Sequence, residues 1–384
     1  MGSRAQYIVR QDGRWDTYYA HWAGGNLHLD LLAGPEHCTR LARAQEPDDR
    51  GLMRSGEPVG AVLIDHDLRR LLWFGDCRDT FQRKLILATV ARMWPGWRIE
   101  WAYDGMGDLA FAVGLDPAQT KQQRSFELPA ELLAHPDFAH ELKQSMAMLS
   151  EGGYSAPVEI SGGRVSAGVP PVDDIDLEAY LARCGDDPGT MPRNTCLLSV
   201  ARDDTVSAYV TSTSAAAVYE NGPAVVERIT ADFTPRTSWP AFPTSGVHFD
   251  SGRKTAAWWT IDTLDQVRDH VDPDLWADWE WAFWADDHSR HLALTGESLV
   301  LPVPDPATVV AQLIEDVCKH RQLDSGTEAV ALAQRVDGMM TAVLGATADK
   351  LVDNSFNHRP MDLPQETFVQ ILESITTIDF QTHP

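Results

Sequence analysis

The sequence predicts an α+β protein in which one domain of hairpins and helices occurs twice and is followed by a helical C-terminal tail. Short apolar stretches separated by turn residues indicate paired strands in antiparallel or mixed sheets. The same series of features occurs in both halves of the 384-residue chain, which is the signature of an internal repeat. A tryptophan-rich motif, Trp94–Trp101 in one half and Trp276–Phe283 in the other, is the most distinctive match.

The first matched feature is a hairpin near the start of each copy. The apolar stretch Tyr7–Val9 runs into a turn at Asp12-Gly13 and continues as Trp15–Trp22. In the second half, Leu197–Arg202 followed by Val206–Val210 has the same shape. Two apolar stretches around a short polar turn are typical of antiparallel strands.

Helices are expected between the strands of each copy. Gly34-Pro35 and Gly222-Pro223 each predict a helix start, because proline is tolerated in the first turn of a helix. In the first copy, apolar residues between Phe81 and Met93 recur at spacings of three and four, which indicates an amphipathic helix before the tryptophan motif. A helix is expected at the same place in the second copy.

A second hairpin follows in each copy. Val62–Asp65 and Leu72–Phe74 correspond to Val247–Asp250 and Ala257–Trp259. The strand before each turn ends in an aspartate, and a turn aspartate commonly bonds its own backbone a few residues on. We therefore expect Asp65 and Asp250 to stabilise equivalent turns.

These matches divide the chain into four parts. The first repeat domain is expected at 6–150 and the second at 195–322. Residues 151–194 form a linker that contains one hairpin, Val158–Ala167, and a short helix around Asp176–Leu181. The tail at 323–384 contains helices expected at 329–344 and 364–375, and Asp305-Pro306 starts the helix before it.

Composition and charge exclude several classes of function. The chain has 32 Lys and Arg against 56 Asp and Glu, which gives a net charge of −24. Such a surface repels nucleic acid and anionic lipid, so neither is expected as a partner. Five scattered cysteines without a Cys-x-x-Cys pair favour free thiols in the cytoplasm. No segment has the 18 or so apolar residues that span a membrane.

The candidate catalytic residues are His21, His37, Asp65, His248, Asp250 and Asp286. The spacing of His248 and Asp250 is that of the His-x-Asp motif of iron oxygenases, with His288 or His291 as a third ligand. The matching segment of the first copy has no histidine, so no metal is predicted. His21 and His37, together with His28 and Asp30, have no histidine counterparts in the second copy, and a difference between copies is where a function can arise.

The tryptophans have two interpretations. A large apolar ring with one N–H group is typical of a core residue, and the alternative is an aromatic groove between the copies. The candidate ligand-binding residues are Trp259, Trp284, Trp101 and Trp281. Trp259 and Trp284 have Phe74 and Ala102 as counterparts, so they are specific to the second copy.

No catalytic motif for nucleotide chemistry, serine hydrolysis or zinc proteolysis occurs in the chain, and no cofactor is predicted. The sequence favours a soluble, acidic binding protein of a bacterial type, which neutralises a protein partner as an immunity protein does or sequesters a ligand. The alternatives are an enzyme acting on a small molecule at the interface of the two copies, with or without a metal, and an oligomerising module.

Overall fold

A computed structural model describes residues 3–77, 79–121, 125–127, 158–161, 164–167, 171–184, 195–203, 205–263, 274–296, 299–320 and 363–378. The chain forms two compact units. Unit 1 comprises Met1–Lys121, Ile261–Gln266 and Val303–Pro384, and unit 2 comprises Gln122–Thr260 and Val267–Pro302. Both units combine a mixed sheet with helices, so the predicted α+β class is confirmed.

The sheet of unit 1 has the strand order β3-β2-β1-β4-β5-β6. The strands are β1 (Ala5–Gln11), β2 (Arg14–Ala20), β3 (Glu46–Pro47), β4 (Gly60–Asp65), β5 (Arg70–Phe74) and β6 (Arg98–Trp101). Both predicted hairpins are present, because β1 pairs with β2 and β4 pairs with β5 in antiparallel fashion. The pairs β1–β4 and β5–β6 are parallel, and helices connect them.

The sheet of unit 2 repeats this arrangement in the order β11-β10-β12-β13-β14. The strands are β10 (Cys196–Arg202), β11 (Thr205–Thr211), β12 (Ser245–Asp250), β13 (Thr255–Thr260) and β14 (Glu280–Phe283). Antiparallel and parallel pairs alternate as they do in unit 1. Two sheets with one topology confirm the repeated domain.

The strand registers align the two sheets residue by residue. Ala5 pairs with Gly60 in unit 1, and Cys196 pairs with Ser245 in unit 2. The second hairpin turns are equivalent too: the backbone N–H of Leu68 donates to Asp65 Oδ1 at 3.0 Å, and that of Arg253 donates to Asp250 Oδ1 at 2.9 Å. The predicted role of both aspartates in turns is thereby confirmed.

Helices cover the sheet of unit 1. They are α1 (Leu27–Asp30), α2 (Gly34–Arg43), α3 (Thr80–Met93), α4 (Met106–Ala112), α12 (Pro306–His320) and α15 (Gln365–Thr376), with short 3₁₀ turns η1 (Gly24–Asn26), η2 (Leu31–Ala33) and η3 (Pro117–Thr120). Helix α3 begins at a capped end, because the Asp79 carboxylate accepts from the N–H groups of Phe81 and Gln82.

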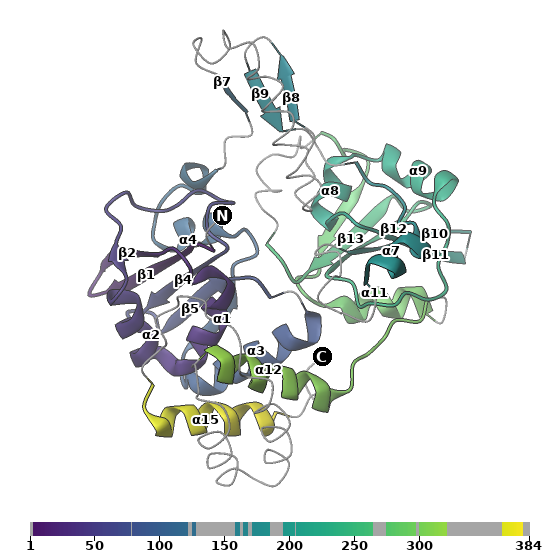
Figure 1. The fold of residues 1–384 in the computed structure, drawn as a ribbon. Coiled ribbons are helices and arrows are strands. Elements are labelled where there is room, and N and C mark those ends of the chain that lie inside the picture. Colours follow the sequence, from purple (N-terminus) through teal and green to yellow (C-terminus); the bar gives the residue numbers. More distant parts are fainter. Residues whose placement is uncertain are drawn as a thin grey trace. The chain divides into compact units, whose positions relative to one another are not determined.

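The C-terminal part of the chain completes the core of unit 1. Helices α12 and α15 pack beside α3 (Figure 1), and their apolar faces are buried with it. The sequence assigned α12 to the second domain, but its apolar face, from Val309 to Cys318, lies in the core of unit 1. Helix α15 confirms the predicted last helix. The helix expected at 329–344 lies outside the described residues.

Unit 2 has corresponding helices. They are α7 (Leu177–Cys184), α8 (Ala215–Glu220), α9 (Ala224–Asp232) and α11 (His288–Thr295). A separate three-stranded sheet contains β7 (Ser125–Glu127), β8 (Val158–Ser161) and β9 (Arg164–Ala167), and it includes the predicted linker hairpin. The helix expected before Trp276 lies outside the described residues.

The tryptophan motif performs the same structural task in both units. The indole N–H of Trp94 donates to the Leu31 carbonyl at 2.7 Å, and that of Trp276 donates to the Tyr219 carbonyl at 2.8 Å. Both rings are buried, so each anchors the end of a strand connection to the helical layer. Within the described part of the chain, no helix is long and apolar enough to cross a membrane.

Candidate functional site

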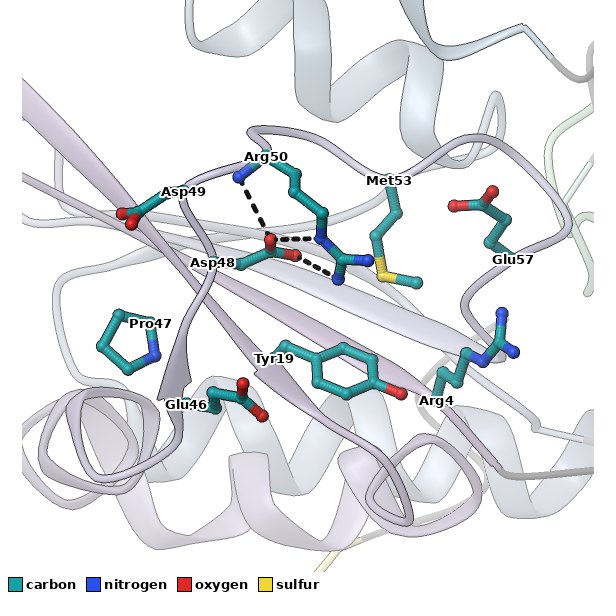
Figure 2. A pocket seen from close by; sticks show the side chains of 9 residues that line it. All are labelled: Arg4, Tyr19, Glu46, Pro47, Asp48, Asp49, Arg50, Met53 and Glu57. Atoms are coloured by element: carbon teal, nitrogen blue, oxygen red, sulfur yellow. Dashed lines mark hydrogen bonds and ion pairs between the residues drawn. The ribbon is translucent and has the colours of Figure 1, made fainter.

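Unit 1 contains a polar pocket of about 500 Å³. It is lined by Arg4, Tyr19, Glu46, Pro47, Asp48, Asp49, Arg50, Met53 and Glu57. Figure 2 shows Arg50 folded back over Asp48, with the Tyr19 ring nearby and the other carboxylates spaced around this pair. The pocket therefore combines one aromatic ring with four carboxylates and two guanidinium groups.

The loop that carries most of these residues is held by buried polar groups of the sheet. Thr17 in β2 bonds the Asp48 backbone on both sides, with its hydroxyl and its carbonyl. The amide of Gln6 in β1, which is fully buried, donates to the Gly51 carbonyl at 2.8 Å and accepts from the Met53 N–H at 2.9 Å. These bonds fix the pocket wall against the sheet.

One ion pair inside the pocket is already satisfied. Arg50 donates through Nε to Asp48 Oδ1 at 2.8 Å and through Nη2 to Asp48 Oδ2 at 3.1 Å. The hydrogen bond from Arg50 holds the pKa of Asp48 below its usual range. Asp48 is buried whereas the Arg50 side chain is 77% exposed, so the cation of this pair faces solvent.

The remaining charges give the pocket a negative excess. Four carboxylates and two guanidinium groups give the pocket lining a formal net charge of 2 − 4 = −2. Glu46, Asp49 and Glu57 are all exposed. By its charge this pocket attracts cations and repels anions, and the chain's overall charge of −24 works in the same direction.

Unit 2 contains a buried polar network on the face of its sheet that α11 covers. Ser199 Oγ lies 2.8 Å from His248 Nδ1 and 2.7 Å from His291 Nε2. The indole N–H of Trp259 donates to His291 Nδ1 at 3.0 Å. Ser199, Trp259 and His291 are 1% exposed or less.

Gly246 gives this network its space. A Cβ at this position would lie 2.4 Å from Trp259 Nε1 and 2.6 Å from His291 Nδ1, well inside contact distance. Glycine is needed here for the close approach of two side chains rather than for an unusual backbone conformation. The corresponding residue of unit 1 is Ala61, where no such pair of polar side chains meets.

Burial keeps both histidines of the network neutral. Desolvation lowers the pKa of His291 to about 3, and the neighbouring His248 acts in the same direction. Desolvation also lowers the pKa of His248, which Asp250 opposes. A neutral imidazole has one N–H donor and one nitrogen acceptor, so His291 can accept from the indole N–H and donate to the serine hydroxyl.

A second buried network ties helix α12 to the N-terminal part of unit 1. The Asp30 carboxylate accepts from the Tyr7 hydroxyl at 2.9 Å and contacts His320 Nε2 at 2.7 Å. Both Asp30 and His320 have side chains less than a tenth exposed. Burial raises the pKa of Tyr7 well above its ordinary value, with Asp30 next in effect. This network anchors the end of α12 to α1.

The six predicted catalytic residues are divided equally between the two units. His21 is exposed, with Nδ1 at 2.6 Å from the Tyr19 hydroxyl, and His37 Nε2 lies 3.4 Å from the Thr367 hydroxyl of α15. Asp286 precedes α11 and its carbonyl accepts from the His288 N–H. Asp65, Asp250 and His248 were placed above. Asp65 is also buried and forms an ion pair with Arg10 at 3.6 Å, and His248 belongs to the buried network of unit 2.

The four predicted ligand-binding tryptophans lie in different surroundings. Trp259 belongs to the buried network, and Trp284 is partly exposed with its ring 6.4 Å from that of His291. Trp101 packs edge-on against Trp73 at 4.8 Å, and Trp281 packs with Tyr219 at 4.5 Å. A groove between the copies stays a prediction, as does an enzyme at their interface.

The described ranges hold no group of three or more His, Cys, Asp or Glu side chains that could bind a metal ion. Sequence reasoning missed three contributors to the two sites: Ser199, Gly246 and the loop around Asp48. Ser199 and Gly246 have a signal in the sequence, because aligning the copies sets them against Ile8 and Ala61. For the loop around Asp48, comparing the two copies gives no such signal.

In comparisons with known proteins, no family model, no curated protein and no solved structure matches this chain. Its function is therefore inferred from the geometry of its own residues.

Proposed function

We propose that this chain is a binding protein that captures a basic protein partner, with a cationic side chain of the partner seated in the acidic pocket of unit 1. The observation that carries the proposal is the pocket itself, with four carboxylates against two guanidinium groups. Because the Asp48–Arg50 pair is already neutral, Glu46, Asp49 and Glu57 face Arg4 with two unbalanced negative charges.

The chemistry of the pocket favours arginine or lysine from a partner over a small anion. A carboxylate set beside an aromatic ring attracts a guanidinium or ammonium group through charge and through the ring face. The Arg50 guanidinium lies 5.8 Å from the centre of the Tyr19 ring, which shows that the site accommodates this kind of contact.

Neutralisation of a basic protein in a bacterial cytoplasm is the activity we propose for this site. The acidity of the whole chain would speed the encounter with such a partner and would make it sensitive to salt. The buried cysteines Cys38, Cys77, Cys196 and Cys318 are free thiols, which suits a reducing compartment.

The test is binding of a fluorescent hexa-arginine peptide to the full chain. The triple variant Glu46→Gln, Asp49→Asn and Glu57→Gln removes the unbalanced charges of the pocket. We expect its affinity for the peptide to fall about tenfold at low salt, because three surface charge pairs of about 0.5 kcal/mol each contribute about 1.5 kcal/mol together.

A control variant separates the pocket from the net charge. Glu366→Gln, Glu373→Gln and Asp232→Asn remove the same number of negative charges at exposed positions that do not line the pocket. Because total charge falls equally, this control variant should bind the peptide almost as wild type does. Equal loss in both variants would contradict the proposed function and would leave only a diffuse attraction to an acidic surface.

A further inference from the structure

The α11 face of unit 2 is built differently from the α4 face of unit 1. Where unit 1 has the buried apolar residues Ile8, Leu63, Phe74 and Leu109, unit 2 has Ser199, His248, Trp259 and His291. One fold therefore packs well with hydrocarbon at these positions. Four hydrogen-bonding groups in their place point to a task that the apolar copy does not have.

The hydrogen bonds of this network run in one direction. Trp259 can only donate, so His291 Nδ1 must accept, and its proton lies on Nε2. His291 Nε2–H then donates to Ser199 Oγ. The buried Ser199 hydroxyl finds its acceptor in this network at His248 Nδ1, which leaves the proton of His248 on Nε2.

The Nε2–H group of His248 is the donor at the end of this series of hydrogen bonds. The residue is 9% exposed, whereas its counterpart Leu63 is fully buried. Within the part of the chain that the structure describes, no side chain or backbone group accepts a hydrogen bond from Nε2. The Nε2–H group of His248 is nearly buried, is oriented by the bond between Nδ1 and Ser199, and can donate a hydrogen bond to a ligand oxygen.

Three positions on the same sheet face as His248 carry small side chains in unit 2 and larger ones in unit 1. Ala201, Ala257 and Ala282 stand at the positions of Arg10, Leu72 and Glu100. The neighbouring strands thus carry no long or charged side chain at the positions beside His248.

We propose that unit 2 binds an uncharged carbonyl compound, such as an amide, with its oxygen accepting a hydrogen bond from His248 Nε2–H. The network favours a neutral acceptor over an anion. A doubly protonated His248 would turn a second N–H toward Ser199 Oγ and deprive the serine hydroxyl of its acceptor. Asp250 lies two residues along the same strand, on the same face, and repels a carboxylate.

The other charged group next to Asp250 does not change this choice. Arg253 Nη1 lies 3.6 Å from Asp250 Oδ2 and its side chain is 83% exposed, so the pair is neutral and turned toward solvent. This site lies within unit 2 and does not depend on the acidic pocket of unit 1. Either proposal can fail without the other.

The experiment uses the full chain labelled with ¹⁵N-histidine, observed by NMR at neutral pH. The ring nitrogens report the tautomer directly, and His248 and His291 should both carry the proton on Nε2. N-methylacetamide is the neutral probe and acetate is the charged one. Saturable shifts of the His248 ring signals with N-methylacetamide, larger than those with acetate, are the expected result, while the exposed His21 serves as an internal reference.

Two variants test the role of the network. Ser199→Ala removes the group that orients His248, so a mixed tautomer and about tenfold weaker binding of N-methylacetamide are expected. Ser207→Ala, in the neighbouring strand β11, changes a serine outside the network and should leave both unchanged. If Ser199→Ala does not fold, the wild-type measurements decide alone. A proton on His248 Nδ1, no saturable shift, or a larger effect of acetate would overturn the proposal.

Discussion

Acid should destabilise unit 2 specifically through its buried histidines. The pKa of His291 is lowered from 6.5 to about 3. Between pH 6.5 and about pH 3, His291 is therefore protonated in the unfolded chain and neutral in the folded chain. Stability is therefore fully present above about pH 6.5 and is lost as the pH falls toward 3. The lowered pKa of His248 adds to the loss in the same direction.

The size of the effect follows from the shift. For one group that stays neutral in the folded state, each pH unit below 6.5 lowers the free energy of unfolding by about 1.4 kcal/mol. His291 alone therefore lowers the free energy of unfolding of unit 2 by about 3 kcal/mol at pH 4.5. A loss of this size is a large part of the stability of a typical domain. Hydrogen exchange of the β12 amides, corrected for intrinsic rates, measures the free energy of opening at pH 7 and at pH 4.5.

The chain supplies its own control in the residues of unit 1. The variant Ser199→Ile, His248→Leu, Trp259→Phe and His291→Leu gives unit 2 the apolar set that unit 1 has at these positions. Carboxylates common to both proteins cancel in the comparison, so the variant should lose about 3 kcal/mol less than wild type between the two pH values. If the repacked variant is poorly folded, the double variant Trp259→Phe and His291→Leu serves instead. An equal loss in wild type and variant would refute the reasoning.

Further predictions concern single residues. Gly246→Ala should lower the free energy of unfolding, measured by urea denaturation, by about 1–3 kcal/mol, because its Cβ would overlap Trp259 and His291. The control Gly252→Ala, whose Cβ would lie 3.5 Å from the nearest atom, should change the free energy of unfolding by less than about 0.5 kcal/mol. Asp30→Ala should cost unit 1 about 3 kcal/mol or more by leaving Tyr7 and His320 without their shared acceptor, and an unchanged melting temperature would count against that role. Acid should also destabilise unit 1, because burial lowers the pKa of His28 to about 4, and His28→Gln should reduce that acid sensitivity in hydrogen exchange of β4.

The fold could be predicted from the sequence because its signals are local and occur twice. A strand, an aspartate turn and a second strand can be recognised from a few residues, and the second copy supports the interpretation of the first. The match of Trp94 to Trp276 is reliable for a physical reason, since both indoles bond a carbonyl of the helical layer at the same place.

The placement of α12 could not be predicted, because it depends on packing between distant parts of the chain. Its apolar face is equally suited to either copy, and only the structure shows it in the core of unit 1. The pocket was missed for a similar reason. Asp48 has the sequence context of a solvated loop carboxylate, and its burial follows from bonds that Thr17 and Gln6 make across the sheet.

The unit 2 network was within reach of the sequence but was only partly found. The sequence marks His248 as a candidate, whereas Ser199 has the context of one more residue in an apolar strand. Comparing the copies position by position would have set Ser199 against Ile8 and His248 against Leu63. A polar residue in one copy opposite an aliphatic residue in the other marks a difference in function more clearly than a histidine on a loop.

The most direct test of the proposed function is an NMR titration of the full chain with the hexa-arginine peptide, observed at the side-chain Nε–H of Arg50. This group donates to Asp48 at 2.8 Å, so a guanidinium that enters the pocket competes with it for the carboxylate. A saturable shift of the Arg50 Nε–H signal, together with backbone shifts confined to the loop from Glu46 to Glu57, is the predicted result. An unchanged Arg50 signal, with shifts spread over the acidic surface of both units, would contradict a cation site in this pocket.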